Sequence, residues 1–359
     1  MIDPTLRPSA GFAAEKRLLA WYDANKRALP WRGSSDPWAV WVSETMLQQT
    51  RVETVLDYYG PFMKRFPTPA ALAKAPLDDA LKAWEGLGYY SRIRNLKSAA
   101  ERVAASGAYP RTATQWALLP GVGPYTAAAL ASIVAGEPEP VADGNVVRVV
   151  ARLRAERLDP HDPRDRAASA DWLRPALLRT GDPARFNQAV MELGETVCIP
   201  GPPRCEACPL AGACRGRATG RPDDFPKKRP PKELPERRFA AFVVRDAKGR
   251  PLLFRRPADG LLAGLWELPM VAVRHSPSVA DARRALDSLG LAADELRPLG
   301  DIRHDFTHFR QILHLWDAVG GPRPSVRRAD RRYADPATLP VATASRRALE
   351  FASAARSAH

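Results

Sequence analysis

The chain has no long uninterrupted apolar stretch. None of its hydrophobic runs reaches the roughly 18 residues that a membrane-spanning helix needs. Residues 1–17 also lack the apolar core of a secretory signal peptide. Cysteine is scarce, with four in 359 residues, which argues against a disulfide-rich secreted scaffold. These shortages predict a soluble intracellular protein.

Acidic residues are outnumbered by basic ones. There are 40 Asp and Glu against 54 Lys and Arg, so the formal net charge is +14. Such an excess favours a polyanionic partner, either a nucleic acid or an anionic membrane surface. The alternative is that an arginine-rich composition serves solubility alone, and charge by itself does not decide between these interpretations.

The first part of the chain carries helical patterns only. With 359 residues the chain is long enough for two domains. No strand pattern precedes the cysteines, so residues 1–215 are predicted to form an all-α domain. The expected helices are 12–29, 37–59, 69–75, 77–84, 91–105, 146–153, 166–180 and 183–197.

Residues 216–238 differ in composition from both sides. Seven of them are Gly or Pro, interleaved with charged residues, which predicts a basic, semi-extended linker. Beyond it, residues 239–359 mix strand and helix patterns and are predicted to form a small α+β domain. The expected strands are 239–244, 251–254 and 311–316, and the expected helices are 280–289 and 343–355.

All four cysteines lie close together, in the spacing Cys198-x6-Cys205-x2-Cys208-x5-Cys214. Four clustered thiols in an intracellular protein predict a metal site. They could hold a tetrahedral zinc ion or an iron–sulfur cluster. The spacing does not choose between these two, because it matches neither the ferredoxin patterns nor a pair of zinc knuckles. Nothing in it indicates that the metal takes part in a reaction.

A turn with two glycines separates two helical patterns at Leu119-Pro120-Gly121-Val122-Gly123-Pro124-Tyr125-Thr126. Glycine permits positive φ and close backbone approach, and Pro124 fits the first turn of the following helix. The amides around Gly121, Val122 and Gly123 would face outward beside the positive end of that helix. Such a turn can bind an anion, for instance a DNA phosphate. Taken alone, it could equally be a tight turn without a ligand.

Two acidic residues form a candidate catalytic pair. Asp143 stands before a helix, at an N-cap position where the helix dipole favours the ionised form. Glu44 lies in an apolar helix, where burial would raise its pKa and keep it protonated. A protonated acid beside an ionised one can cleave a glycosidic bond. The plainer interpretations are that Asp143 only caps its helix and that Glu44 pairs with an arginine on a solvated face.

Five motifs in one order carry a resemblance to a known family. They are Ser43-Glu44-Thr45-Met46-Leu47-Gln48-Gln49-Thr50, Gly86-Leu87-Gly88-Tyr89-Tyr90-Ser91-Arg92, Leu119-Pro120-Gly121-Val122-Gly123, Val141-Ala142-Asp143-Gly144-Asn145-Val146 and the cysteine spacing. This set resembles the MutY-type adenine DNA glycosylases of the helix–hairpin–helix superfamily, which also contains endonuclease III. The resemblance implies a [4Fe-4S] cluster at Cys198, Cys205, Cys208 and Cys214. It also implies removal of adenine mispaired with 8-oxoguanine, or with G, from double-stranded DNA.

Tyr125 separates the two main branches of that superfamily. In the endonuclease III-like branch a lysine at this position attacks the sugar. A phenol cannot form a Schiff base, and no lysine occurs between Lys97 and Lys227 to replace it. The sequence therefore predicts a monofunctional glycosylase with weak or absent strand cleavage. The alternatives are an endonuclease III-like enzyme with lyase activity and a DNA-binding protein without activity.

The resemblance also implies roles for further residues. Tyr125 and Asn145 would support Asp143. Arg27, Trp31, Leu47 and Glu192 would line the adenine pocket, although Trp31 could instead be a core residue. Gln49, Thr50, Leu87 and Tyr89 would wedge into the duplex. We expect a monomer in the cytoplasm, associated with the nucleoid as in bacteria.

The second domain carries a resemblance of its own. Residues 260–269 resemble the C-terminal domain of the MutY-type enzymes, which is similar to MutT, a Nudix hydrolase. The glutamate pairs that hold Mg²⁺ in a working Nudix site do not follow Glu267, so this domain should not hydrolyse nucleotides. By resemblance, Phe306, Thr307 and His308 would contact 8-oxoguanine, with Thr307 in place of the usual serine. Without the resemblance, His308 would be an ordinary surface histidine.

Overall fold

The computed structural model describes residues 11–229, 233–320 and 330–357. By backbone contacts the chain divides into two compact units. The first contains Met1–Ala73 and Asn95–Pro230, and the second contains Lys74–Arg94 and Pro231–His359. The sequence-based boundaries 1–215, 216–238 and 239–359 stay predictions.

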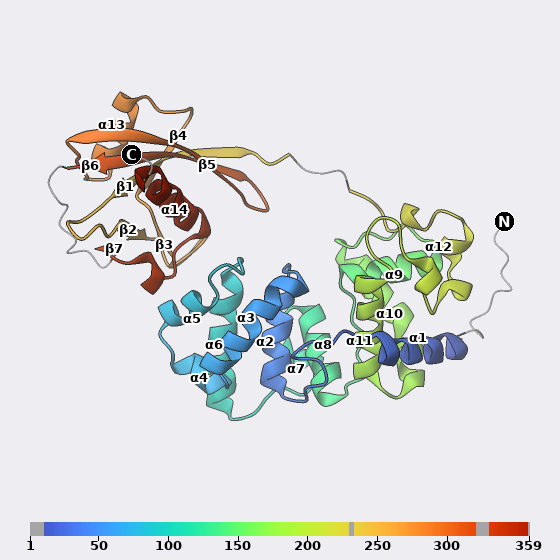
Figure 1. Ribbon diagram of the computed structural model, residues 1–359. Coiled ribbons are helices and arrows are strands. Elements are labelled where there is room, and N and C mark those ends of the chain that lie inside the picture. The colour runs from blue at the N-terminus through green and yellow to red at the C-terminus, as the bar shows by residue number, and fades with distance from the viewer. Residues whose placement is uncertain (1–10, 230–232, 321–329, 358–359) are drawn as a thin grey trace. The chain divides into compact units, whose positions relative to one another are not determined.

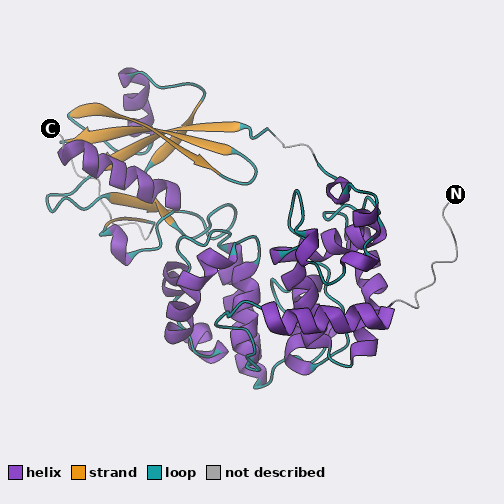
Figure 2. Cartoon of the chain, turned by 45° about the vertical axis from the view of Figure 1, so that its right-hand side comes forward, coloured by secondary structure: helices purple, strands orange, loops and turns teal. Residues whose placement is uncertain are grey.

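The described residues before Glu236 form helices and no strands, which agrees with the all-α prediction. Within the described ranges the first strand begins only at Glu236 (Figures 1 and 2). The helices are α1 (Gly11–Asn25), α2 (Pro37–Leu47), α3 (Val52–Arg65), α4 (Pro69–Lys74), α5 (Leu77–Ala83), α6 (Ser91–Ser106), α7 (Ala113–Trp116), α8 (Pro124–Ala135), α9 (Gly144–Arg154), α10 (Pro163–Thr180), α11 (Pro183–Thr196) and α12 (Arg215–Ala218). Helices α2, α10 and α11 each begin with an Asp N-cap followed by proline, a sequence that caps the first amides and presets φ.

The predicted helix 37–59 is wrong as a single element. It divides into α2 and α3, because Gln48 leaves the helical conformation and Gln49 adopts a φ of 57°. A residue other than glycine rarely takes positive φ, so this turn is a strained feature of the backbone. The predicted helix 12–29 is also too long, since α1 ends at Asn25.

Helices α8 and α9 are central to the first unit. Helix α8 contacts α2, α7 and α11, and α9 contacts α10, α11 and α12. Small side chains fill much of α8, where residues 127–131 are all buried, so neighbouring helices can approach it closely. Gly123 is the N-cap of α8, and Asp143 is the N-cap of α9. The packing of these helices against their neighbours therefore fixes the positions of both N-termini.

The first part of the predicted linker is folded rather than extended. Helix α12 and a 3₁₀ turn, η4 (Pro222–Asp224), lie within it. Arg152 of α9 donates from Nε to the carbonyls of Pro222 and Phe225, both at 3.1 Å. A buried guanidinium needs such acceptors, and composition alone did not reveal that this segment would supply them.

The described residues of the second unit form two sheets. The larger has the order β4 (Met270–Val273), β1 (Glu236–Val244), β6 (Arg310–Val319) and β5 (Glu295–Asp305), with only the β1–β6 pair parallel. The smaller is β3 (Trp266–Glu267), β2 (Leu252–Arg255) and β7 (Arg331–Tyr333). Alternate residues of β1 enter two separate cores: Ala241 and Val243 pack in the same cluster as residues of α14 (Thr343–Ser357), whereas Phe242 packs with residues of α13 (Val279–Ser288).

The α+β prediction is confirmed for this part of the chain, but its strand list is incomplete. The segments around the turn at residues 246–249 do not form a regular hairpin, because β1 and β2 belong to different sheets. Strand β5 was missed because it is charged, mostly exposed and interrupted by a register shift between Pro298 and Gly300. In the described parts, no helix is both long and apolar enough to span a membrane.

Candidate active site

A cavity of about 1380 Å³ in the first unit collects most of the predicted site residues. They come from α2 and its following turn, the two-glycine turn, the start of α9, and α11. The residues that line it include Arg27, Trp31, Glu44, Leu47, Gln49, Thr50, Gly121, Gly123, Tyr125, Asp143, Asn145 and Glu192. Val122 is buried and does not line it. Segments far apart in sequence meet here, such as those of Arg27 and Glu192, which are 165 positions apart.

Glu44 lies inside α2 and is 8 % exposed. Burial raises the pKa of its carboxyl to about 7, helped by the negative charges of Asp143 and Glu195. A hydrogen bond with Tyr125 acts in the opposite direction. Glu44 is therefore not on a solvated face, and near neutral pH a large fraction of it carries a proton.

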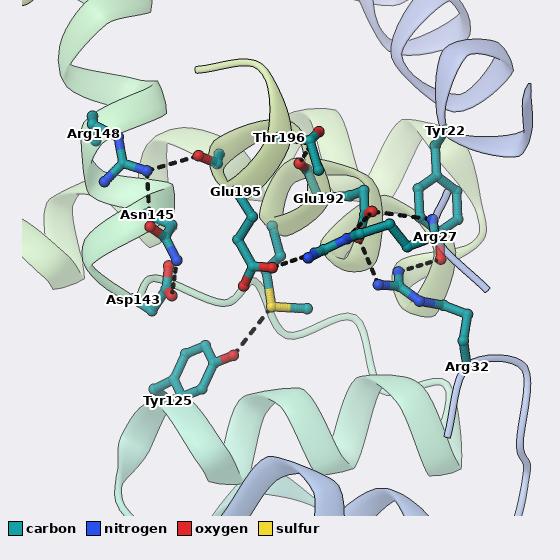
Figure 3. Close-up of polar contacts among 12 residues, drawn as sticks. Tyr22, Arg27, Arg32, Tyr125, Asp143, Asn145, Arg148, Glu192, Glu195 and Thr196 are labelled. Atoms are coloured by element: carbon teal, nitrogen blue, oxygen red, sulfur yellow. Dashed lines mark hydrogen bonds and ion pairs between the residues drawn. The ribbon is translucent and has the colours of Figure 1, made fainter. Parts of the chain in front are cut away.

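Asp143 is the N-cap of α9. Its Oδ1 accepts from the amide of Val146 at 2.7 Å, and its Oδ2 accepts from Asn145 Nδ2 at 3.2 Å (Figure 3). Burial raises the pKa of this carboxyl, and the Val146 hydrogen bond opposes that rise. The amide at the helix N-terminus thus lowers the pKa of Asp143 as predicted, but burial raises this pKa by more.

Tyr125 is the second residue of α8. Its hydroxyl donates to Met191 Sδ at 3.1 Å (Figure 3). Burial, together with the charges of Glu44 and Asp143, raises the pKa of the phenol well above its usual value. Tyr125 therefore stays a neutral hydroxyl at physiological pH and brings no amine to the cavity.

A cluster of charged residues closes one side of the cavity. Glu192, whose side chain is 1 % exposed, accepts on Oε1 from the backbone N and Nε of Arg27 and on Oε2 from Nη2 of Arg27 and of Arg32. Burial alone would raise the pKa of Glu192, but these donors lower it. Glu195, one turn further along α11, also accepts from Arg27 (Figure 3).

The sequence reasoning missed Arg32, Arg148, Met191 and Glu195, which also line this cavity. Glu192 and Glu195 are three positions apart on a helix and so lie on the same face, which was the signal available for Glu195. Arg148 donates to Asn145 Oδ1 at 2.8 Å, to the Gly194 carbonyl at 2.7 Å and to the Cys198 carbonyl at 2.7 Å. It thereby connects the residue beside Asp143 with the start of the cysteine segment.

The two-glycine turn requires glycine at one of its positions. Gly121 has a φ of 76°, and a Cβ there would lie 2.6 Å from Cβ of Asn95. Gly123 has no such restraint and serves as the N-cap of α8, followed by Pro124 as predicted. Among the described residues no acceptor occurs for the amides of Gly121 and Gly123. The turn therefore presents unpaired donors at the edge of the cavity.

Two of the four predicted wedge residues have an unusual backbone conformation. Gln49 has a φ of 57° and Tyr89 a φ of 47°, and they are two of four such non-glycine residues in the described ranges. Strained backbone is retained most often where function needs it. Of the other two candidates, Thr50 follows Gln49 in the same turn, whereas Leu87 is 5 % exposed. A buried Leu87 would need to move before it could reach a duplex.

The comparisons with known proteins agree with this geometry. Residues 42–175 match the HhH-GPD superfamily of base excision DNA repair proteins, and residues 240–351 match the NUDIX domain. The chain is 40 % identical to the human adenine DNA glycosylase, over 86 % of this chain and 67 % of that protein. It is 41 % identical to the enzyme of the same name from Mycobacterium tuberculosis (strain ATCC 25618 / H37Rv), over 68 % and 79 %. The chain belongs to the adenine DNA glycosylase family.

Family membership makes the protein a DNA glycosylase of base excision repair. A solved structure supports the fold: a thermostable thymine-DNA glycosylase, 26 % identical, aligns with a TM-score of 0.52 over 57 % of this chain and 95 % of its own. The two predicted folds, a helix–hairpin–helix domain and a Nudix-like domain, are thereby confirmed.

The cysteine segment of this glycosylase lies against α9. All four cysteines are free thiols, and they line one small cavity together with Arg152 and Arg217. Arg152 Nη1 donates to Cys198 Sγ at 3.4 Å, and the amide of Arg217 donates to Cys214 Sγ at 3.4 Å. Across the described ranges, no three His, Cys, Asp or Glu side chains are arranged to hold a single metal ion.

The second unit brings the predicted lesion-contact residues near Tyr89. The Tyr89 hydroxyl shares a hydrogen bond with Thr307 Oγ1. The rings of Phe306 and Phe309 stack with centroids 4.6 Å apart, and His308 is exposed. This glycosylase therefore carries an exposed hydroxyl and an aromatic pair at the tip of its β5–β6 connection.

Proposed function

We propose that the protein is a monofunctional adenine DNA glycosylase, which hydrolyses the N-glycosidic bond of adenine opposite 8-oxoguanine or G. The observation that carries the proposal is one cavity in which Glu44, with a pKa of about 7, lies with Asp143 and with Tyr125 in place of an amine. Such a set of groups can cleave a glycosidic bond but cannot form a Schiff base.

The proposed reaction uses the two carboxyls in different protonation states. Glu44 acts as the acid, and Asp143 acts as the negative carboxylate. The adenine first leaves the base stack, because its glycosidic bond is out of reach inside a duplex. Glu44 donates its proton to N7 of the adenine, which makes the base a better leaving group. The C1′–N9 bond breaks, Asp143 stabilises the positive sugar, and Glu44 as a base accepts a proton from the attacking water. The product is an abasic site.

The adenine pocket is proposed to be Arg27, Trp31, Leu47 and Glu192. Each carboxylate oxygen of Glu192 already accepts two N–H donors, so its position is fixed before any base enters. A fixed pocket favours one orientation of the base. Trp31 is 8 % exposed and packs edge-on against Tyr59, so it contributes to the core as well as to the cavity wall.

DNA is proposed to bind through three kinds of contact. The turn of Gly121, Val122 and Gly123 would hold a backbone phosphate by its unpaired amides, a contact without sequence preference. Gln49, Thr50, Leu87 and Tyr89 would fill the space that the extruded base leaves. Phe306, Thr307 and His308 would contact 8-oxoguanine. The hydrogen bond between Tyr89 and Thr307 supports a joint role for the wedge residues and the residues that contact 8-oxoguanine.

A [4Fe-4S] cluster is proposed at Cys198, Cys205, Cys208 and Cys214. Zinc and iron–sulfur clusters both take thiolate ligands, and the resemblance to the family favours the cluster. Four free thiols around one cavity, with N–H donors to two of the sulfurs, fit a larger cluster of iron and sulfide. The cluster would hold the segment against α9, and no step of the proposed hydrolysis needs it.

The monomeric state and the cytoplasmic, nucleoid-associated location are part of the proposal. Its central test is a single-turnover assay on duplexes with adenine opposite 8-oxoguanine, adenine opposite G, and thymine glycol. We expect excision of adenine, with strand breaks appearing only after treatment with alkali. Release of thymine glycol with direct nicking would instead support an endonuclease III-like enzyme. Binding of all three duplexes without excision would support a protein that only binds DNA.

A further inference from the structure

The loop that carries Tyr89 has an unusual backbone. Residues 86–89, which we call the wedge loop, lie in the connection between α5 and α6. Three of these four residues adopt positive φ: Gly86 at 101°, Gly88 at 71° and Tyr89 at 47°. Glycine takes such angles readily, but tyrosine does not. Surrounding groups must therefore hold Tyr89 in this conformation.

Arg92, in the first turn of α6, supplies much of that support. It is 7 % exposed, and its Nη2 donates to the carbonyls of Leu87 at 2.9 Å and Gly88 at 3.1 Å. Its guanidinium carbon lies 5.3 Å from the centre of the Trp84 ring and 5.7 Å from the centre of the Tyr89 ring. Distances below about 6 Å allow a cation–π interaction. One side chain thus contacts both the backbone of the wedge loop and the ring of Tyr89.

Two aromatic side chains also hold the wedge loop. Trp84 Nε1 donates to the Gly88 carbonyl at 3.2 Å, and the amide of Gly86 donates to the Tyr90 hydroxyl at 3.3 Å. Trp84 and Tyr90 are buried, whereas Tyr89 is 41 % exposed. The wedge loop is therefore attached to buried groups and presents one exposed ring.

The burial of Arg92 is unfavourable by itself. It lowers the pKa of the guanidinium to about 10, so the group stays charged at neutral pH while losing hydration. A buried polar group needs hydrogen bonds to offset that loss, and Arg92 finds two of them in the carbonyls of Leu87 and Gly88. Arg94 on the same helix also has its pKa lowered by burial, but it donates to the Ala263 carbonyl at 2.8 Å.

We propose that Arg92 is a positioning residue that holds Tyr89 in its wedge conformation before DNA binds. Because the strained conformation is already formed, the cost of ordering it is not added to the cost of extruding the adenine. Without Arg92 the wedge loop would relax, and Tyr89 would enter the duplex less often. This inference rests on the proposed insertion of Tyr89 into DNA, but not on the chemistry at Glu44.

The test is a double-mutant cycle of Arg92→Lys and Tyr89→Ala in the full-length protein. Lysine keeps the charge but lacks the planar group that reaches the loop carbonyls and the two rings. We expect Arg92→Lys to reduce the single-turnover rate of adenine excision at least about tenfold, as a misplaced positioning group does. In the Tyr89→Ala background the same change should add little, because Arg92 acts through Tyr89. Equal factors in both backgrounds would overturn the proposal.

A fluorescence measurement separates the position of Tyr89 from the excision reaction. A 2-aminopurine placed next to the target adenine should brighten when the protein binds, since a wedge unstacks it. We expect the parent and the matched control Arg94→Lys to give this increase, and Arg92→Lys to lose most of it. An equal loss in both variants would contradict a specific role of Arg92. A parent that brightens the probe but removes no adenine would refute the proposed excision and leave the wedge supported.

Gly88→Ala perturbs the same loop if Arg92→Lys does not fold. A Cβ at Gly88 would meet nothing within 4 Å, but a φ of 71° is strained for alanine. We expect this variant to lose the fluorescence increase as well, and its loss of excision rate to disappear in the Tyr89→Ala background. An unchanged signal would show that the conformation of the wedge loop does not determine the insertion of Tyr89.

Discussion

The cavity of the first unit and a smaller one in the second unit differ in how their polar groups are paired. In the first unit, Glu44 and Tyr125 are buried close enough to Asp143 that its negative charge raises the pKa of both. In the second, Arg256 pairs with Glu267, and the buried Oε1 of Gln311 has no donor among the described residues. Strongly coupled ionisable groups suit bond breaking, whereas an open acceptor beside aromatic rings suits recognition. The comparison supports our proposal that one unit carries out the reaction and the other discriminates between bases.

The largest expected effect tests the first half of this comparison. Glu44→Gln removes the proposed acid but keeps the size of the side chain. We expect the single-turnover rate of adenine excision to fall by about 10²–10⁴-fold, the usual contribution of a general acid. Affinity for the duplex, measured by fluorescence anisotropy, should change little. A variant that keeps its excision rate would show that Glu44 is not the acid.

The two-glycine turn provides the next largest effect. Gly121→Ala would place a methyl group against Asn95 and force alanine to a φ of 76°, which costs about 1–2 kcal/mol from the backbone conformation alone. We expect a lower melting temperature and weaker, less salt-dependent DNA binding. Gly123→Ala is the matched control, because its Cβ would meet nothing within 4 Å and its φ is ordinary. Equal losses in both variants would argue against a special role for Gly121.

The pH dependence of the rate should show the coupling of the buried acids. The acid form of Glu44 is required, so the rate should decrease as pH rises through its pKa of about 7. Glu195→Gln removes a negative charge that raises this pKa, so the decrease should begin at a lower pH. Because Glu195 is one-third exposed, we expect at most about a tenfold loss at pH 8, the equivalent of one pKa unit. An unshifted profile would contradict this coupling.

The sequence reached the central site through residues that carry their own local signal. Glu44 lies in an apolar helix, Asp143 precedes a helix, and Gly121 occurs in a two-glycine turn. Glu195 and Arg148 were missed because each matters only through a partner that folding brings near, namely Arg27 and the carbonyls of Gly194 and Cys198. Sequence periodicity cannot report such partners.

The prediction of helices and strands is limited in the same way, because it also depends on local sequence signals. The starts of α2 at Pro37 and α11 at Pro183 were predicted correctly, since capping is local, whereas α10 begins at Pro163 rather than at the predicted residue 166. The break at Gln49 was not predicted, because a positive φ in a glutamine is imposed by the surrounding structure rather than by its own preference. Strand β5 lacks buried alternation over most of its length and is held by its pairing with β6, which no local pattern records.

The smallest expected effect tests the recognition half of the comparison. Thr307→Ala removes an exposed hydroxyl that bonds Tyr89. We expect a severalfold loss of preference for adenine opposite 8-oxoguanine over adenine opposite G, in single-turnover rates, with the rate on A opposite G unchanged. Thr307→Ser is the control and should behave like the parent. Equal losses on both duplexes would assign Thr307 to general DNA binding instead.

The hydrogen bonds of Arg152, near the end of α9, affect which segments of the molecule unfold together. Its buried guanidinium donates to Cys198 Sγ and to the carbonyls of Ile199, Gly201, Pro222 and Phe225. One side chain therefore joins a helix, the cysteine segment and the start of the connection to the second unit. Freeing any one of these would leave donors without acceptors, so the three should unfold together as one cooperative unit. Their backbone amides should consequently exchange with solvent deuterium at a common rate.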